Sequence, residues 1–381
     1  MLSLNLAEPG PTRLAYDCKY FYSDRPCKFH KLHGVVCQCE YYAETESRLL
    51  IVKLDAMGDV LRTTAMLPPL AKQYPGARID WITRPESLPL LANNPFIHSA
   101  IGYGTDALVR LQTTTYDHVI NLDSNQLSAS LASMARGTHW HGFVLNESGN
   151  VVGTNDAAHR WLLMGVNDTV KRANRTETYQ QFMLDILGLD REGHRYVLEL
   201  TAQEQEFAQS TFDRIGIDRS RPVVGLNVGA GGRWQLKKWR PQGFAELCED
   251  LHGRGIQIVL LGGPSDVVEI GELLALLKVP VFQPGTNHPL RHFAALVDRC
   301  DLVVTGDTLA MHIALARSRR VVVLFGPTSS AEIDLYNLGE SVVPDMTCLC
   351  CYKSECDFQP NCMDLISTTM VRDAVLRNLP K

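Results

Sequence analysis

Residues 48–64 read RLLIVKLDAMGDVLRTT, and this stretch decides the fold class. Its first half, RLLIVKL from Arg48, is apolar on both faces, which is typical of a central strand in a parallel sheet. A turn is expected at Gly58, and a helical pattern begins near Asp59. A buried strand that leads through a turn into a helix predicts the β–α–β alternation of a doubly wound sheet.

The same alternation continues outward from this stretch and then restarts further along the chain. Helices are expected at 176–189 and 201–217, the second capped by Thr201 with Glu204 three residues later. From residue 136 to about residue 175 no period is clear, so we expect this part to line a cleft or form insertions. The strands that we expect besides the first lie at 77–84, 116–123, 222–230, 256–263, 301–307 and 320–326.

This pattern predicts an α/β protein with two Rossmann-like, doubly wound domains that face each other across a cleft. We expect a Cys-rich N-terminal extension at residues 1–47, a first domain at 48–200 and a second domain at 201–381. In such folds ligands bind at the carboxyl ends of the strands, so the cleft is the expected site.

Composition limits the class of protein. The chain has 381 residues, of which 45% are hydrophobic and 21% are charged, which is ordinary for globular domains. A net charge of −5 argues against a nucleic-acid partner. The first residues lack a basic start followed by an apolar core, and no apolar run approaches the roughly 18 residues of a membrane span. We therefore expect a cytoplasmic protein, with at most peripheral contact with the inner membrane.

Eleven cysteines are many for such a protein, and nine of them fall into two clusters. Metal binding is favoured over disulfides, because no export signal is present, and over isolated buried thiols, because of the clustering. Neither cluster has the spacing of a zinc ribbon, but four thiolates suit a structural zinc or iron ion. The cysteines that we expect to bind it are Cys18, Cys27, Cys37 and Cys39 and, in a second cluster, Cys348, Cys350, Cys351, Cys356 and Cys362.

Polar residues follow the strands of both domains at the turns into helices. Asp59 either caps its helix or projects into the cleft as a general base, and its position leaves both readings open. The loop GAGGRWQLKKW, with Gly231 and Lys237, is typical of an anion site, although a flexible loop with solvated lysines has the same composition. Asp266, in LLGGPSD, suits either a ribose hydroxyl or a helix cap.

The stretch VVTGDTLAMHIALA contains a fourth such turn. Gly306, Asp307 and Thr308 lie between a strand and a helix, and a helix N-terminus with a hydroxyl group is a natural anion site. A single histidine is more often structural, but His312 lies near the start of a helix that points at the cleft. This placement favours a role in binding.

Together these motifs resemble glycosyltransferase family 9, the ADP-heptose:lipopolysaccharide heptosyltransferases. The segments that carry the resemblance are LLIVKLDAMGDVLRTTAMLPPL, GLNVGAGGRWQLKKWRPQGFAEL, IVLLGGPSD and DLVVTGDTLAMHIALARSRRVVVLFGPTS, within residues 48–370. The resemblance implies a GT-B fold and an inverting transfer from a nucleotide-diphosphate sugar, usually ADP-heptose. It also implies that the first domain binds a glycan, lipopolysaccharide-core or protein acceptor and that the second binds the donor.

The resemblance assigns roles to particular residues. It implies that Asp59 is the catalytic base, that Lys237 binds phosphate, and that the segment from Asp307 through Thr308 to His312 holds the leaving diphosphate. It also implies that transfer needs no metal. The chain departs from the family at Leu309, where glycine is common, and in the glycine loop, where many members have threonines. These departures leave the donor sugar open.

Two further expectations depend on this resemblance. A non-catalytic sensor of nucleotide-sugars or metals is the alternative function, but the presence of Asp59, Lys237 and His312 favours an enzyme. An epimerase would need a nicotinamide site, and the chain has no G-x-G-x-x-G motif. Because the chain end often crosses back to the first domain in GT-B proteins, we expect the two cysteine clusters to lie near each other.

Overall fold

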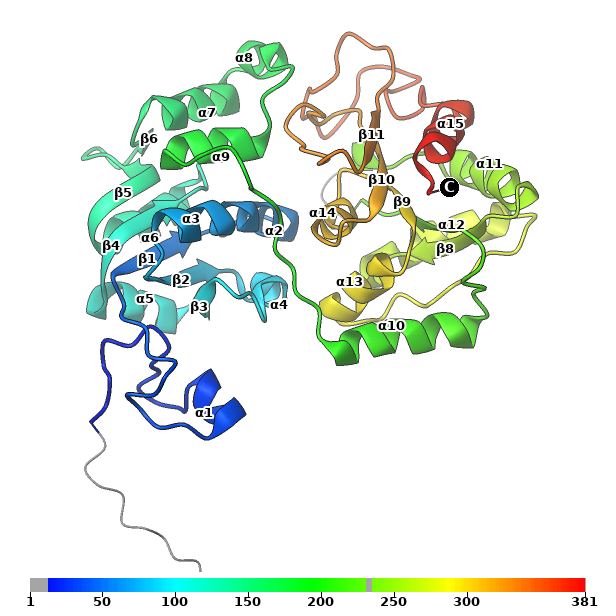
Figure 1. Cartoon of the computed structure of the whole chain (residues 1–381). Helices are drawn as coiled ribbons and strands as arrows, with labels where there is room; N and C mark the ends of the chain where they lie inside the picture. The colour runs from blue at the N-terminus through cyan, green and yellow to red at the C-terminus, as the bar shows by residue number, and fades with distance from the viewer. Residues whose placement is uncertain (1–12, 231–234, 381) are drawn as a thin grey trace, which may run out of the picture.

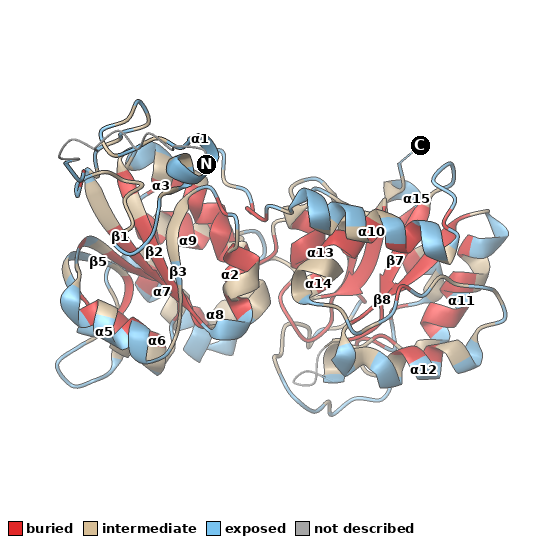
Figure 2. Cartoon of the chain, turned by 90° about the horizontal axis from the view of Figure 1, so that it is seen from below, coloured by how far each residue is buried: buried red, intermediate tan, exposed pale blue. Residues whose placement is uncertain are grey.

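The computed structural model describes residues 13–230 and 235–380. These residues form two α/β domains beside each other, with the N-terminal extension below the first domain in Figure 1. Figure 2 shows that the strands of both sheets are buried, whereas the outer helices expose one face to solvent. Among the described residues, no helix combines the length and the apolar character that crossing a membrane requires.

The first domain is built on a six-stranded sheet in the order β3-β2-β1-β4-β5-β6. All neighbouring strands are parallel except β5 and β6, which form an antiparallel pair. The strands are β1 (Ser47–Val52), β2 (Ala77–Thr83), β3 (Ile97–Gly102), β4 (Thr115–Asn121), β5 (Arg136–Leu145) and β6 (Val151–Gly153). The expectation of an irregular segment after residue 136 is wrong, because β5 is a strand of 10 residues in which Gly142 and Phe143 are buried.

Helices cover both faces of this sheet. One hydrophobic core lies beneath α2 (Met57–Thr63), α3 (Leu67–Gln73) and α9 (Tyr179–Leu187). The other lies beneath α5 (Thr105–Thr113) and α6 (Gln126–Met134). Two-sided burial explains why β1 is apolar at successive positions.

The second domain has a five-stranded parallel sheet in the order β11-β10-β9-β7-β8. Its strands are β7 (Val223–Asn227), β8 (Gln257–Leu261), β9 (Leu302–Gly306), β10 (Arg320–Leu324) and β11 (Gly339–Val342). Helices α10 (Ala202–Ile215), α13 (Leu290–Asp298) and α14 (Leu309–Ala316) pack on one face. Helices α11 (Pro241–Gly253), α12 (Val267–Leu276) and α15 (Thr368–Asn378) pack on the other.

The chain passes from the first sheet to the second between α9 and α10, near the predicted domain boundary (Figure 1). The predicted cap of α10 is present, since Thr201 and Glu204 form a capping box. At the junction α2 packs against α14, and one hydrophobic core continues from the first domain into the second. The turn that carries Asp59 is therefore held against the helix that carries His312.

The two cysteine clusters lie in different places, so the expectation that they are neighbours is wrong. The N-terminal extension, with the short helix α1 (Lys28–His33), lies against the first domain, where the Tyr22 hydroxyl donates to His98 O at 2.8 Å. The C-terminal segment instead packs on the second domain: the Trp239 indole N–H donates to Ile366 O at 2.9 Å. The last helix, α15, also stays with that domain, against α11 and β10 (Figure 1).

Candidate functional site

A cavity of about 790 Å³ lies between the two domains at the carboxyl ends of their strands. The first domain contributes Asp59 to its wall, and the predicted residues that the second domain contributes are Lys237, Asp266, Asp307, Thr308 and His312. Gly306 lies just behind this wall, where an added Cβ would be 3.1 Å from Lys237 O. Gly231 lies outside the described residues. The cavity has the size of a typical small-ligand site.

Asp59 does not cap its helix, so the alternative role considered for it is wrong. Helix α2 begins at Met57 after Ala56, which places Asp59 within the first turn. Its carboxylate instead pairs with Arg62 Nη2 at 2.7 Å, one helical turn further on. The guanidinium group of Arg62 also lies 3.7 Å from the centre of the Tyr179 ring. Sequence analysis missed Arg62, although a spacing of three residues on a helix could have suggested the pair.

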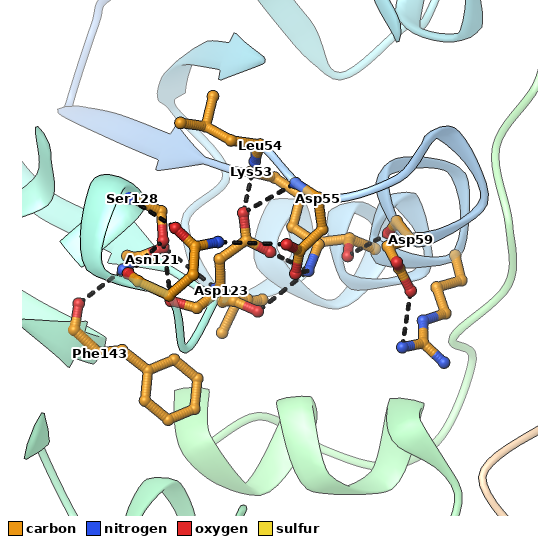
Figure 3. Close-up of polar contacts among 12 residues, drawn as sticks. Lys53, Leu54, Asp55, Asp59, Asn121, Asp123, Ser128 and Phe143 are labelled. Atoms are coloured by element: carbon orange, nitrogen blue, oxygen red, sulfur yellow. Dashed lines mark hydrogen bonds and ion pairs between the residues drawn. The ribbon is translucent and has the colours of Figure 1, made fainter. Parts of the chain in front are cut away.

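A buried ionic network supports the turn that leads to Asp59 (Figure 3). Asp123, which follows β4, forms an ion pair with Lys53 and accepts hydrogen bonds from the backbone N–H groups of Leu54 and Asp55. Lys53 Nζ also donates to Leu122 O at 3.1 Å. The side chains of Lys53 and Asp123 are 2% and 0% exposed. The network therefore fixes the end of β1 against the end of β4, directly before the Asp59 turn.

The charges in this network are set by burial and by the ion pair. Burial alone lowers the pKa of Lys53, but Asp123 reverses this and raises it well above its ordinary value. Burial raises the pKa of Asp55, yet Lys53 brings that pKa down to about 2. Burial raises the pKa of Asp123, and Lys53 opposes the shift. Lys53 therefore stays charged in the interior because carboxylates surround it.

In the second domain, Lys237 and Asp307 form an ion pair at the end of β9. Lys237 Nζ lies 2.8 Å from Asp307 Oδ2 and donates to Asp307 O at 3.2 Å. Burial raises the pKa of Asp307, but Lys237 and then His312 lower it below its ordinary value. Thr308 is the N-cap residue of α14 without a side-chain cap bond, because its hydroxyl contacts the Thr305 hydroxyl at 2.9 Å. An uncapped helix N-terminus beside a lysine is suited to an anion.

His312 is buried at the junction of the domains. Its Nδ1 lies 3.1 Å from the Tyr196 hydroxyl. Burial, together with the positive charge of Arg62, lowers the pKa of His312 to about 4, so the ring is neutral at physiological pH. A Cβ added at Gly58 would lie 2.6 Å from Cδ2 of this ring. Gly58 therefore lets the two domains approach, which the motif alone did not reveal.

Asp266 has the capping role considered for it, and its contact with a ribose hydroxyl stays a prediction. Its Oδ2 accepts a hydrogen bond from the Gly263 N–H at 2.8 Å, which caps the 3-10 turn Pro264–Asp266. It also lines the cavity and lies against Gly229, where an added Cβ would be 2.0 Å from Oδ1. The carboxylate is thus held in place beside the glycine loop.

The loop between β10 and β11 supplies cleft residues that sequence analysis missed. Thr328 and Glu332 line the cavity and are 5% and 9% exposed. Lys171, on α8 (Asp168–Ala173) of the first domain, lies 4.4 Å from the centre of the Tyr352 ring on the opposite wall. The loop between β10 and β11 has no hydrophobic period, so the sequence did not indicate which of its side chains face the cleft.

The cysteines do not form a ready metal site in this structure. All of them are free thiols, and the described residues contain no group of three or more His, Cys, Asp or Glu side chains arranged to hold a metal ion. The first four line a hollow of about 350 Å³ within the extension. In the second cluster, burial raises the pKa of Cys362 to about 11, and the neighbouring thiols Cys351, Cys356 and Cys348 add to the shift. The metal hypothesis therefore stays a prediction.

Comparison with known proteins identifies a family. Residues 107–361 match the model of glycosyltransferase family 9 (heptosyltransferase). The chain is 26% identical over 300 residues to lipopolysaccharide heptosyltransferase 2 of Escherichia coli (strain K12), which covers 74% of this chain and 83% of that protein. More than half of the chain thus matches one family.

Solved structures agree at the level of the fold. A family 9 glycosyl transferase from Veillonella parvula DSM 2008 superposes with a TM-score of 0.67 and 20% identity, over 87% of this chain and 97% of that chain. The E. coli ADP-heptose LPS heptosyltransferase II superposes with a TM-score of 0.63 and 21% identity, over 87% and 98%. The predicted GT-B fold, with two parallel-sheet domains facing a cleft, is confirmed.

Proposed function

Because this chain belongs to glycosyltransferase family 9, and is therefore a glycosyltransferase, we propose that it transfers a heptose from ADP-heptose to a lipopolysaccharide core. The observation that carries this proposal is the cavity itself. Asp59 lines one wall, and Lys237, Asp307 and His312 line the other. A base and an anion site on opposite walls are what a transfer between two bound substrates requires.

In the proposed reaction Asp59 is the general base. Its carboxylate takes the proton from an acceptor hydroxyl while that oxygen forms a bond to the anomeric carbon of the donor sugar. The bond from the anomeric carbon to the diphosphate oxygen breaks on the opposite face, so the configuration inverts. The electron pair of the broken bond leaves with ADP, and the carboxylic acid later returns its proton to solvent.

The leaving diphosphate needs positive partners. Lys237 and the N-terminus of α14 supply them, and the Thr308 hydroxyl lies at the same end of that helix. When a diphosphate arrives, Lys237 can exchange its bond to Asp307 for one to a phosphate oxygen. This mechanism uses no cofactor for the transfer step. We also propose a cytoplasmic location, where nucleotide-sugar donors are available, with a glycan, lipid-linked or protein acceptor.

The proposal is tested with Asp59→Asn and Asp59→Ala. We expect both variants to bind ADP with unchanged affinity in calorimetry and to lose transfer from ADP-heptose by a factor of about 10² to 10⁴. Near-normal turnover by Asp59→Ala would refute the role of Asp59. If the parent protein binds nucleotide-sugars but neither transfers nor hydrolyses any of them, the alternative function of a non-catalytic sensor is correct.

A further inference from the structure

Glu332 is a buried carboxylate in the cleft without a strong partner. It is 9% exposed and lines the cavity on the side of the second domain. Within residues 13–230 and 235–380 it forms no ion pair, and its side chain accepts only a long hydrogen bond from the Tyr352 hydroxyl at 3.4 Å. Buried carboxylates are normally paired or fully hydrogen-bonded. Glu332 is therefore a candidate for contact with a ligand.

The backbone of Glu332 is fixed at the junction of the domains. Its carbonyl oxygen accepts a hydrogen bond from the Tyr179 N–H at 2.9 Å, across the cleft. The ring of Tyr179 supports Arg62, which pairs with the catalytic base. Burial raises the pKa of Glu332, and the charge of Arg62 opposes this shift while Asp307 adds to it. Glu332 thus lies within electrostatic reach of both the base side and the diphosphate side.

Two further polar groups nearby also lack a well-formed hydrogen bond. Arg62 Nε is buried and makes no hydrogen bond with any described residue, and Thr328 Oγ1 meets no described partner at full hydrogen-bond geometry, although it lies close enough to Asp307 to help lower the pKa of that carboxyl. Of all the described side chains with such an atom, these are the two that line the cavity. Unpaired buried groups cost free energy unless a ligand completes them. Arg62 and Thr328 thus line the same cavity as Glu332, and Arg62 and Asp307 lie within electrostatic range of its carboxylate.

In the proposed reaction, the donor sugar must occupy the part of the cavity that Glu332 lines. The donor sugar is joined through its anomeric carbon to a diphosphate at Lys237 and α14, and that carbon must also reach the oxygen deprotonated by Asp59. The sugar ring consequently lies between these groups, beside Glu332. A carboxylate can accept two hydrogen bonds from neighbouring hydroxyls, which suits a polyhydroxylated ring.

We propose that Glu332 is a specificity-determining residue that accepts hydrogen bonds from hydroxyl groups of the transferred sugar. This inference rests on the proposed function, because it assumes a nucleotide-sugar donor. A site built around such bonds strongly rejects an analogue that lacks the hydroxyl, because the buried carboxylate is then left unpaired. Glu332 therefore selects the sugar, whereas Lys237 and α14 hold the part that all ADP-sugars share.

The test compares ADP with ADP-heptose in the parent protein, Glu332→Gln and Glu332→Ala, with Glu272→Gln on the exposed side of α12 as the matched control. We expect the affinity for ADP to stay within about 3-fold in all variants, and the affinity for ADP-heptose and kcat/KM to fall about 10- to 100-fold in the Glu332 variants alone. Deoxy analogues of the donor should be rejected by the parent but not by Glu332→Ala.

Each other outcome overturns the inference in a distinct way. Unchanged donor affinity and turnover in Glu332→Gln and Glu332→Ala would show that Glu332 does not touch the sugar. An equal loss of ADP affinity would indicate that Glu332 contacts the diphosphate. A rise in the acceptor KM alone would indicate that Glu332 contacts the acceptor. Failure of the parent to bind or transfer from ADP-heptose would overturn the proposed function as well, which the parent measurements reveal by themselves.

Discussion

Replacing Lys53 with methionine should destabilise the first domain far more than removing an exposed lysine. The substitution keeps the apolar stem but leaves Asp123, whose side chain is 0% exposed, without its cation. Breaking a buried pair from one side costs about 3–5 kcal/mol in the free energy of unfolding. The matched control is Lys278→Met, since the pair of Lys278 with Glu249 is exposed and is worth roughly 0–1 kcal/mol.

Urea unfolding and hydrogen exchange measure this difference. The exchange of the Leu54 and Asp55 amides is informative, because both donate to Asp123. Lys53→Met should therefore lose protection in that peptide, and Lys53→Met/Asp123→Asn should recover part of the stability because no buried charge is left unpaired.

The loss of stability in Lys53→Met should also depend on pH. Lys53 opposes the rise in the pKa of Asp123, so its removal raises that pKa further above the unfolded value. The pKa of Asp123 in the parent is about 7, and a still higher pKa penalises the folded state once that carboxyl would ionise, so the deficit should grow as pH rises above about 7. A Lys53→Met protein that unfolds within about 1 kcal/mol of the parent, like the exposed control, would refute this reasoning.

Three other predictions concern Gly58, His312 and the cysteine clusters. Gly58→Ala should cost about 1–3 kcal/mol and reduce turnover, because the new Cβ would lie 2.6 Å from the His312 ring. Gly271→Ala, inside α12 with open space around it, should instead stabilise the protein by up to about 1 kcal/mol in urea unfolding. The pKa of His312 is lowered from 6.5 to about 4. The neutral ring therefore contributes fully to stability above pH 6.5, and roughly 3 kcal/mol of this stability is lost as pH falls toward 4. Stability profiles of the parent and His312→Gln should therefore diverge in that window, and parallel profiles would contradict it. For the cysteine clusters, metal analysis of untagged protein should find about one equivalent of zinc or iron if the sequence-based prediction is right, and less than about half an equivalent would exclude it.

Much of the fold could be predicted because parallel strands buried on both faces leave a strong apolar signal. The segment at β1 and the restart at β7 had this character, and both strands were placed within a few residues. The segment at β5 was missed because Thr138, His139 and Trp140 in succession are exposed, which leaves no apolar alternation. Its parallel pairing with β4 and its antiparallel pairing with β6 make it a strand, and no local hydrophobic period indicates those pairings.

The site was predictable only where a motif marked it. Asp307 lies at a strand-to-helix turn, and Asp59 and His312 lie in the first turns of helices that follow such turns, so topology brought them to one edge of each sheet. The contact of Arg62 with Tyr179 and the contact of Glu332 with Tyr179 of the other domain needed the tertiary structure, because Tyr179 is distant from both in the sequence. The expectation that the cysteine clusters are neighbours assumed that the chain end crosses back to the first domain, and it is wrong because the C-terminal segment stays on the second domain.

The pairing of Asp59 with Arg62 has a consequence for how the site would act. Arg62 engages Oδ1 of Asp59, the proposed base, which keeps the carboxylate oriented and leaves Oδ2 for the proton of an acceptor. The same guanidinium rests on Tyr179, whose N–H holds the backbone of Glu332 in the second domain. A movement of one domain relative to the other would therefore shift the base and the proposed sugar contact together. If this is how the parts are linked, Arg62→Lys, which keeps the charge but loses the planar fork over the ring, should lower kcat about 10-fold or more while ADP affinity is unchanged. Equal losses of both would instead assign Arg62 to the diphosphate.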